Sequence, residues 1–213
     1  MIRVLLSGGM DSAVCLAWAK RHRLPVGARY DSDLDIVDAV GFHYGQRHAK
    51  ELEAARRIAN MCRVRFRVLP IIDGLGDSSL TGEVGALYGP DVVVPGRNFK
   101  FLEGAALLRP FPDAIVIGAC KDDQADFEDC RPEFFEAASE RLGIPILTPL
   151  VDKTKEEVVR LGRKLGASSL ITLSWSCYAG GERPCRECQA CIARDAGIKA
   201  GAPDWGKRLW ARR

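Results

Sequence analysis

Within its first dozen residues the chain passes from an apolar run, through a loop of small side chains, into a helix. The apolar run is Met1–Leu6, and the loop Ser7–Ser12 reads Ser-Gly-Gly-Met-Asp-Ser. Because glycine has no Cβ, Gly8 and Gly9 let backbone N–H groups approach an anion, and the N-terminus of the next helix adds partial positive charge. The segment therefore predicts a strand–loop–helix unit that binds phosphate.

The polar side chains of this loop refine the prediction. Ser7 and Ser12 add hydroxyl donors, whereas the carboxylate of Asp11 would repel a phosphate unless it holds a metal ion or caps the helix. A mononucleotide P-loop needs Lys-Ser/Thr after its glycines, and the dinucleotide fingerprint needs three spaced glycines; this loop has neither. On the loop alone, an ordinary glycine-rich turn stays open.

Strand and helix patterns alternate over most of the chain. Such alternation predicts an α/β, Rossmann-like parallel sheet with helices on both faces, and the ligand of such a sheet lies at the carboxyl ends of its strands. The loops after the strands should therefore converge on one crevice. Strands are expected over residues 3–6, 40–44, 65–71, 114–118 and 144–147, and helices over 11–22, 48–62, 99–108, 132–142 and 155–165, with a long loop at 73–95.

The length of 213 residues fits one domain, or one domain with a small appendage. We expect one domain over 1–170 that contains the phosphate-binding loop, and a small appendage of helices or loops over 171–213 packed on it. The stretch Gly27–Asp38 contains four aspartates and is expected to be a solvated surface insertion. The basic residues at 207–213 are expected to form a solvated tail.

Composition excludes several classes of protein. The chain has no apolar run of about 18 residues, and Met1–Leu6 is too short for the apolar part of a signal peptide. We therefore expect a cytoplasmic protein without a membrane partner. The net charge of +3 is too small by itself to argue for a nucleic-acid partner, and none is expected.

Four of the eight cysteines are packed into 15 residues. In a reducing compartment such a cluster is typical of metal ligands rather than disulfides. Four thiolates suit zinc and leave no open position on it, so the predicted zinc is structural. An iron–sulfur cluster is the alternative, because spacing alone does not determine the metal. The predicted ligands are Cys177, Cys185, Cys188 and Cys191, so the region 171–213 is expected to bind zinc.

The loop Ser7–Ser12 resembles the pyrophosphate loop of the ATP pyrophosphatase (PP-loop) superfamily, whose members split ATP between its α and β phosphates. The adenylation that this resemblance implies needs positioning and charge neutralisation by magnesium, Lys and Arg. On that basis Asp11 is predicted to orient magnesium, and the candidate catalytic cations are Arg97, Arg131 and Lys155. Cys130 is either a nucleophile or a buried bystander thiol, and no histidine pairs with it in the sequence.

Over nearly its whole length the chain resembles the 7-cyano-7-deazaguanine synthase family of queuosine precursor biosynthesis. The matching stretches are Ser7–Ser12, Phe42–His48 with Glu51 and Leu52, Val94–Asn98, Asp129–Phe134, Thr148–Leu150 with Lys155, and Ser176–Tyr178 with the three cysteines that follow. The resemblance implies an adenine nucleotide α-hydrolase-like fold, with ATP, magnesium and structural zinc as cofactors. It also implies 7-carboxy-7-deazaguanine and ammonia as substrates, and family analogy suggests a homodimer.

The implied reaction activates the substrate twice. ATP adenylates the 7-carboxylate, ammonia gives the amide, and a second ATP activates the amide oxygen so that loss of AMP leaves the nitrile. The planar deazapurine is expected in the crevice, with its carboxylate near the two arginines and its guanine-like edge near Asp129. The predicted substrate-binding residues are Tyr44, Gln46, Arg47, His48, Asn98 and Asp129.

Two departures from the family pattern bear on the acceptor. Asp126-Phe127-Glu128 stands where the family has a Gly-Tyr-Pro run, and the 27–38 insertion lies outside the common pattern. A relative that passes the activated acyl group to another amine, on a small molecule or on a protein, therefore stays open. A tRNA-modifying pyrophosphatase would need an RNA-binding module for which there is little room, and a non-catalytic zinc module that binds nucleotide would not need Asp11 and Arg97.

Overall fold

Five parallel strands form one sheet in the computed structural model, which describes residues 1–22, 37–46, 50–70, 78, 80 and 89–205. The strands are β1 (Ile2–Leu5), β2 (Val37–His43), β3 (Arg65–Pro70), β4 (Ala114–Val116) and β5 (Ile146–Leu147). The helices are α1 (Met10–Arg21), α2 (Lys50–Cys62), α3 (Arg97–Leu107), α4 (Pro132–Leu142), α5 (Lys155–Lys164), α6 (Ser168–Leu173) and α7 (Gln189–Gly201), with short 3₁₀ turns at Gly89–Val92, Lys121–Asp123 and Glu128–Cys130. The predicted α/β parallel sheet is confirmed.

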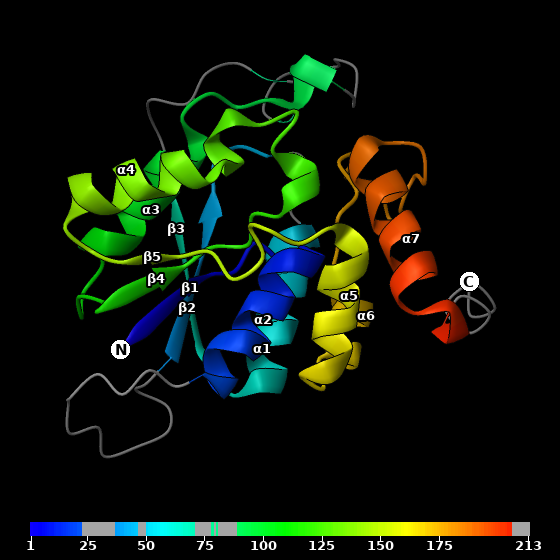
Figure 1. Cartoon of the computed structure of the whole chain (residues 1–213), viewed down its shortest axis with the longest axis horizontal. Coiled ribbons are helices and arrows are strands. Elements are labelled where there is room, and N and C mark those ends of the chain that lie inside the picture. Colours follow the sequence, from blue (N-terminus) through cyan, green and yellow to red (C-terminus); the bar gives the residue numbers. More distant parts are fainter. Residues whose placement is uncertain (23–36, 47–49, 71–77, 79, 81–88, 206–213) are drawn as a thin grey trace.

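Helices cover both faces of the sheet (Figure 1). Successive residues of a strand point to opposite faces, so the apolar strands feed two cores. On one face, Ile2 and Val4 of β1 pack with residues of α1, α2, α5 and α6. On the other face, Leu5 and Val40 pack with residues of α3 and α4. The sheet is thus buried on both sides, as the near-continuous apolar strands predict.

The strand order β3-β2-β1-β4-β5 places a reversal beside β1. The chain runs outward from β1 through β2 to β3, and Ile2 of β1 pairs with Val37 of β2 on that side. The chain then returns to the other side of β1, where Ile2 pairs with Ala114 of β4. In open parallel sheets the ligand crevice lies outside the carboxyl ends of the strands at such a reversal. The loop Ser7–Ser12 leaves β1 at that point.

Asp38 corrects the expected extent of the surface insertion. Asp38 is 3% exposed and lies with Val37 inside β2, whereas residues 27–36 of the predicted insertion lie outside the described residues. Its carboxylate accepts two hydrogen bonds from the buried guanidinium of Arg3, at 2.8 and 2.7 Å, and one from Arg67 at 2.8 Å. A buried charge needs such a partner, so Arg3, which is adjacent in register, draws Asp38 into the sheet.

The same network anchors the C-terminal end of α3. Arg3 also donates to the carbonyl oxygens of Ala105 at 2.8 Å and Leu108 at 2.6 Å, which belong to the last turn of α3 and the residue that follows it. The C-terminal carbonyls of a helix have no intrahelical partners, and a cation satisfies them. The opposite end of α3, which carries Arg97, is therefore held at the carboxyl edge of the sheet.

Two helices near the C-terminus, α6 and α7, were not predicted individually, because the sequence indicated only a small appendage of helices or loops there. Helix α6 is six residues long, and α7 is built mostly of small and polar residues without a clear apolar stripe. Two glycines let α7 approach α5 closely: a Cβ at Gly197 would lie 2.8 Å from the Cβ of Lys155, and one at Gly201 would lie 2.6 Å from the Glu156 carbonyl oxygen. Helix α7 therefore rests against the start of α5. The predicted basic tail lies outside the described residues.

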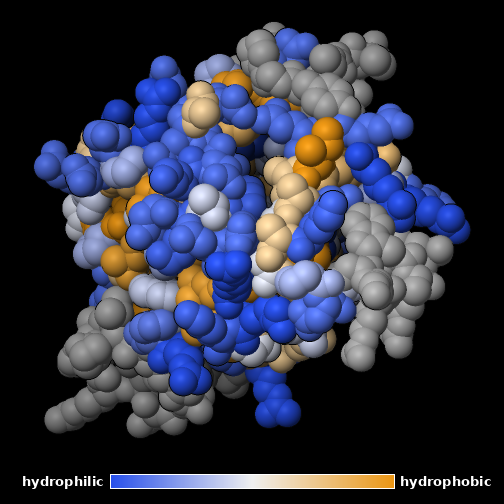
Figure 2. Space-filling model, turned by 45° about the vertical axis from the view of Figure 1, so that its right-hand side comes forward, coloured by the Kyte–Doolittle hydropathy of each residue, from blue (hydrophilic) through white to orange (hydrophobic). Residues whose placement is uncertain are grey.

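Most of the face shown in Figure 2 is hydrophilic, with smaller separate apolar areas. Within the described ranges, no helix has the length and apolar character needed to span a membrane.

Packing between α5 and its neighbours leads to a first prediction. A Cβ at Gly162 would lie 2.6 Å from Cδ1 of Ile171 and 3.0 Å from Cγ2 of Val14. Overpacking a core costs about 1–3 kcal/mol, which exceeds the ~1 kcal/mol that alanine gains over glycine in a helix. We expect Gly162→Ala to lower the free energy of unfolding by about 1 kcal/mol in urea titration. Lys164→Ala, at an exposed position of α5, should change it little; a more stable Gly162→Ala protein would contradict this packing.

Candidate active site

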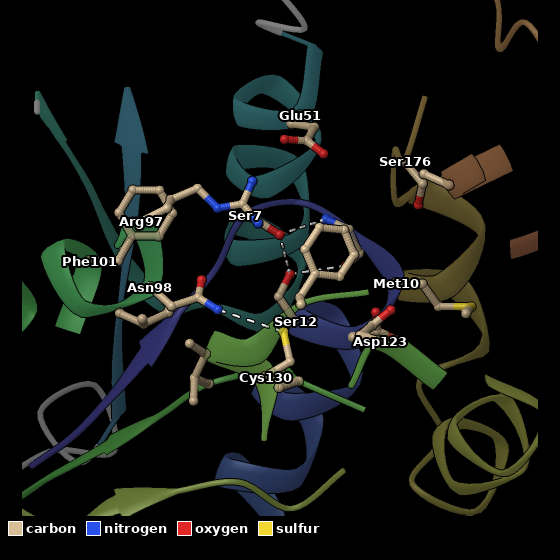
Figure 3. Close-up of a pocket in the computed structure, with 18 of the residues that line it drawn as sticks. Ser7, Met10, Ser12, Glu51, Arg97, Asn98, Phe101, Asp123, Cys130 and Ser176 are labelled. Atoms are coloured by element: carbon tan, nitrogen blue, oxygen red, sulfur yellow. Dashed lines mark hydrogen bonds between the residues drawn. The ribbon is translucent and has the colours of Figure 1, made fainter. Parts of the chain in front are cut away.

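The loop between β1 and α1 is closed by hydrogen bonds among its own residues. Oγ of Ser7 accepts the N–H of Gly9 at 3.2 Å, and Oγ of Ser12 accepts the N–H of Gly8 at 3.3 Å. The two hydroxyl oxygens are 3.1 Å apart, side by side in the centre of Figure 3. Among the described residues no side chain caps α1 at Gly9, so its first-turn N–H groups suit an anion.

Gly8 is required by its surroundings. Its φ is +98°, and a Cβ at this position would lie 2.0 Å from the carbonyl oxygen of Glu51 in α2. Its own carbonyl accepts the N–H of Trp175 at 2.8 Å. The loop is thus clamped between α2 and the segment that follows α6, which holds its backbone in one conformation.

A cavity of about 280 Å³ opens beside this loop. The carboxyl ends of β1, β2 and β4 line it, together with the first turns of α2, α3, α5 and α7. In Figure 3, Arg97 reaches the loop from one side, and Ser176 and Met10 lie on the other. The predicted convergence of strand-end loops on one crevice is therefore observed.

Lys155 lies at the centre of a charged triad in this cavity. Its Nζ donates to Oδ2 of Asp11 at 2.7 Å and to Oδ2 of Asp123 at 3.0 Å, and its side chain is 12% exposed. Burial lowers the pKa of Lys155, but the two carboxylates raise it more, so its pKa lies well above the ordinary value. The ammonium therefore stays protonated at neutral pH.

Asp11 has one oxygen that the triad does not use. Its Oδ1 is buried and has no hydrogen-bond partner in the part of the chain that the structure describes. Burial raises the pKa of this carboxyl, and the charge of Lys155 opposes that rise. An uncompensated buried carboxylate oxygen is costly, and a cation at Oδ1 would relieve that cost.

Arg97 is the first residue of α3 and lies against two phenol side chains. Its guanidinium carbon is 6.0 Å from the centre of the Tyr44 ring, and Tyr178 is close enough to affect the pKa of Arg97. Within the described residues its Nε is buried without a hydrogen-bond partner. Burial lowers the pKa of Arg97, but Tyr44, Tyr178 and Asp129 together raise it by more, so its pKa lies above the ordinary value. A permanent cation therefore faces the cavity.

Asn98 and Asp129 fasten α3 to the loop before α4. Nδ2 of Asn98 donates to the Asp129 carbonyl oxygen at 2.9 Å, and the Asn98 N–H donates to Oδ2 of Asp129 at 3.3 Å. Asp129 thereby satisfies an orphan N–H in the first turn of α3. Asn98 lines the cavity, whereas Asp129 supports it from behind.

Cys130 also lines the cavity and leads to a second prediction. Burial, aided by Asp129, raises the pKa of its thiol to about 12, so almost no thiolate exists at neutral pH. We expect Cys130→Ser to keep kcat within about tenfold of the parent in initial-rate assays. A loss of about a thousandfold in a folded Cys130→Ser protein would instead identify the thiol as a nucleophile.

The four clustered cysteines converge as the sequence predicts. Their Sγ atoms all lie within 4.8 Å of one another, and none of the chain's eight cysteines is in a disulfide. Four bonds of about 2.3 Å to one tetrahedral ion space the sulfur atoms about 3.8 Å apart, whereas a cluster of several irons spaces them more widely. Cys188 is the N-cap of α7, and Cys191 lies in its first turn. The donor set therefore fits one closed metal centre.

The model of the family described as queuosine biosynthesis protein QueC matches residues 2–201. The chain belongs to the QueC family. Proteins named 7-cyano-7-deazaguanine synthase from Chromobacterium violaceum and Oceanobacillus iheyensis are 39% and 36% identical to it; each alignment covers 94% of this chain, and 90% and 95% of the respective relative.

A solved structure supports the fold independently. The structure of NMN synthetase from Francisella tularensis resembles this QueC family chain with a TM-score of 0.53, covering 99% of this chain and 84% of that chain at 16% identity. At that identity the likeness concerns the fold alone. The resemblance stated from the sequence motifs is confirmed at the level of the family.

Not every predicted site residue of this QueC family chain reaches the cavity. Among the described residues, Arg131 does not line it: its Nε donates to the Gln124 carbonyl oxygen at 3.2 Å, and its side chain is 47% exposed. Arg131 precedes Pro132 and has the extended backbone that proline imposes on the residue before it. Gln46 lines the cavity but is occupied in bracing the end of β2, and Arg47 and His48 lie outside the described residues.

Several residues that line the cavity had no role predicted from the sequence. Asp122 accepts the N–H of Lys155 at 2.7 Å, and Asp123 binds its ammonium; both follow β4, where strand-end position was an available signal. Arg194 enters from α7, a helix that was not predicted, so no signal pointed to it. Tyr178 belonged to a matching stretch but was assigned no role.

Proposed function

We propose that this chain converts 7-carboxy-7-deazaguanine and ammonia into 7-cyano-7-deazaguanine at the expense of ATP. The observation that carries the proposal is family membership over residues 2–201, combined with the Ser7–Ser12 loop and the Lys155 triad in one cavity. The names of these relatives favour the nitrile product over transfer of the acyl group to another amine.

In the first half of the reaction, a carboxylate oxygen of the acid attacks the α-phosphorus of ATP and pyrophosphate leaves. Ammonia then displaces AMP to give the amide. The Ser7–Ser12 loop is proposed to hold the phosphates through its N–H and hydroxyl donors. Lys155 and Arg97 offset the charge that develops in the transition state, which is where such donors act most strongly.

In the second half, the amide oxygen attacks a second ATP and pyrophosphate again leaves. Loss of AMP and of the remaining amide protons then forms the carbon–nitrogen triple bond. Each nitrile therefore consumes two ATP and yields two AMP and two pyrophosphate. No side chain has to act as a nucleophile in either half, in keeping with a protonated Cys130 thiol.

Magnesium fits the cavity at the unpartnered Oδ1 of Asp11, because magnesium prefers carboxylate and phosphate oxygens. A bound magnesium ion would supply charge neutralisation for the phosphates. Zinc fits the four-thiolate centre, which has no open position for catalysis and is therefore proposed to be structural.

We also propose that residues 1–170 carry the nucleotide chemistry and that 171–213 form the zinc-binding region. No nucleic-acid partner is proposed, and a homodimer stays a prediction.

The nucleotide products test this proposal. Purified protein is incubated with magnesium, ATP, ammonia and 7-carboxy-7-deazaguanine, and the nucleotides are separated by chromatography. We expect AMP and pyrophosphate that depend on the acid substrate. ADP with orthophosphate would contradict cleavage between the α and β phosphates.

A further inference from the structure

Arg194 joins helix α7 to the nucleotide cavity. It lines the cavity, and its guanidinium donates to the Ile171 carbonyl oxygen at 2.6 Å and to Oγ of Ser174. Both acceptors stand at the C-terminal end of α6. They are uncharged, so these two bonds orient the guanidinium without themselves neutralising it.

Backbone contacts bring this guanidinium to the phosphate-binding loop. Ser174 is followed by Trp175, whose N–H donates to the Gly8 carbonyl oxygen at 2.8 Å. Although burial raises the pKa of the Asp11 carboxyl, the charge of Arg194 is among the groups that lower it. Arg194 therefore lies beside the loop that binds phosphate.

Acidic side chains outnumber basic ones in the lining of the cavity, so a bound triphosphate needs a cation such as Arg194 beside the Ser7–Ser12 loop. The lining includes the carboxyl groups of Asp11, Glu51, Asp122, Asp123 and Asp126 and the basic groups of Arg97, Lys155 and Arg194. Lys155 is held between two carboxylates. A bound triphosphate adds several negative charges, and its binding needs positive groups that point at it.

We propose that Arg194 binds the triphosphate of ATP on the side of the Ser7–Ser12 loop that faces α6 and α7. The inference rests on the proposed function and adds a phosphate-binding residue from outside the loop motif. The cysteine centre sets the position of this residue, because Cys188 is the N-cap of α7 and Cys191 lies three residues before Arg194, on the same side of the helix. The metal centre thereby helps to build the nucleotide site.

Equilibrium binding to the zinc-loaded protein tests the proposal without turnover. The ligands are ATP with magnesium, and adenosine as a probe that lacks phosphate, both measured by calorimetry. We expect Arg194→Gln to weaken ATP binding by at least about tenfold, the usual worth of a charge-assisted hydrogen bond, while adenosine affinity stays within about twofold. Arg183→Gln is the matched control, since Arg183 is exposed in the same segment and lies outside the cavity lining; it should change neither affinity.

Two further variants keep the test decisive if Arg194→Gln does not fold. Arg194→Lys retains the charge but not the planar fork, and Ser174→Ala removes an anchor of the guanidinium while retaining its charge; each should weaken ATP binding by about threefold and spare adenosine. Equal ATP affinity in all the Arg194 variants and Arg183→Gln would overturn the proposal, as would an equal loss of ATP and adenosine binding. A parent chain that binds ATP but forms no nitrile would contradict the proposed function, but the binding measurements on the Arg194 variants would still test whether Arg194 binds the triphosphate.

Discussion

Replacing Lys155 by methionine should lower kcat/KM by about two to three orders of magnitude, the usual effect of removing one electrostatic group from a preorganised site. The substitution also leaves Asp11 and Asp123 facing each other across the place of the ammonium that now separates them. Like charges in a buried site repel both each other and the phosphates of ATP. Initial rates of pyrophosphate release would measure the loss.

Lys164→Met provides the matched control for this experiment. Lys164 is exposed at the last turn of the same helix, so its replacement should leave kcat/KM unchanged. The pKa of Lys155 lies well above its ordinary value of about 10.4, so the parent rate should not fall through deprotonation of this group up to about pH 9. A folded Lys155→Met protein with less than a tenfold loss would contradict the role of the triad.

Replacing Cys188 by serine should prevent stable folding or make the protein insoluble. Cys188 is 1% exposed, and its sulfur belongs to the four-thiolate centre at the start of α7. Metal binding to such centres is coupled to folding and contributes on the order of 10 kcal/mol in zinc-finger peptides, which exceeds the whole stability of many domains. Thermal unfolding and the soluble yield would measure the effect.

Cys62→Ser is the control, because Cys62 lies at the end of α2, outside the cysteine cluster, and should change stability only mildly. Elemental analysis of the parent should find about one zinc per chain, as one four-thiolate centre predicts. Brown protein with iron and labile sulfide would contradict zinc and favour the iron–sulfur alternative.

Local sequence could predict the nucleotide loop because its constraints are local. Adjacent glycines, flanking serines and the start of a helix all lie within Ser7–Ser12, and the strand before it is apolar. The strand-end rule then placed Tyr44, Arg97 and Lys155 in one crevice, because it depends only on the parallel order of the strands. The four-cysteine centre was predictable for the same reason, since its ligands lie close together in the chain.

What could not be predicted depends on contacts between distant segments. Asp38 reads as part of an acidic surface stretch until Arg3, 35 residues earlier, is known to lie beside it in the sheet. Arg131 belongs to a loop at the carboxyl edge of the sheet, but sheet topology does not determine which way its side chain points, and it contacts the Gln124 carbonyl oxygen rather than the cavity. Arg194 lies on a helix whose apolar pattern is weak, and only the packing of α7 on α5 brings it to the cavity.

Mass spectrometry of the deazapurine product tests the proposed reaction most directly. The zinc-loaded protein is supplied with magnesium, ATP and 7-carboxy-7-deazaguanine, with and without ammonia, and the products are followed over time. With ammonia we expect the amide to rise and fall as 7-cyano-7-deazaguanine accumulates, with two AMP formed for each nitrile. An amide that accumulates and never becomes the nitrile, or an acid that is left unchanged while ATP is bound, would contradict the proposed function.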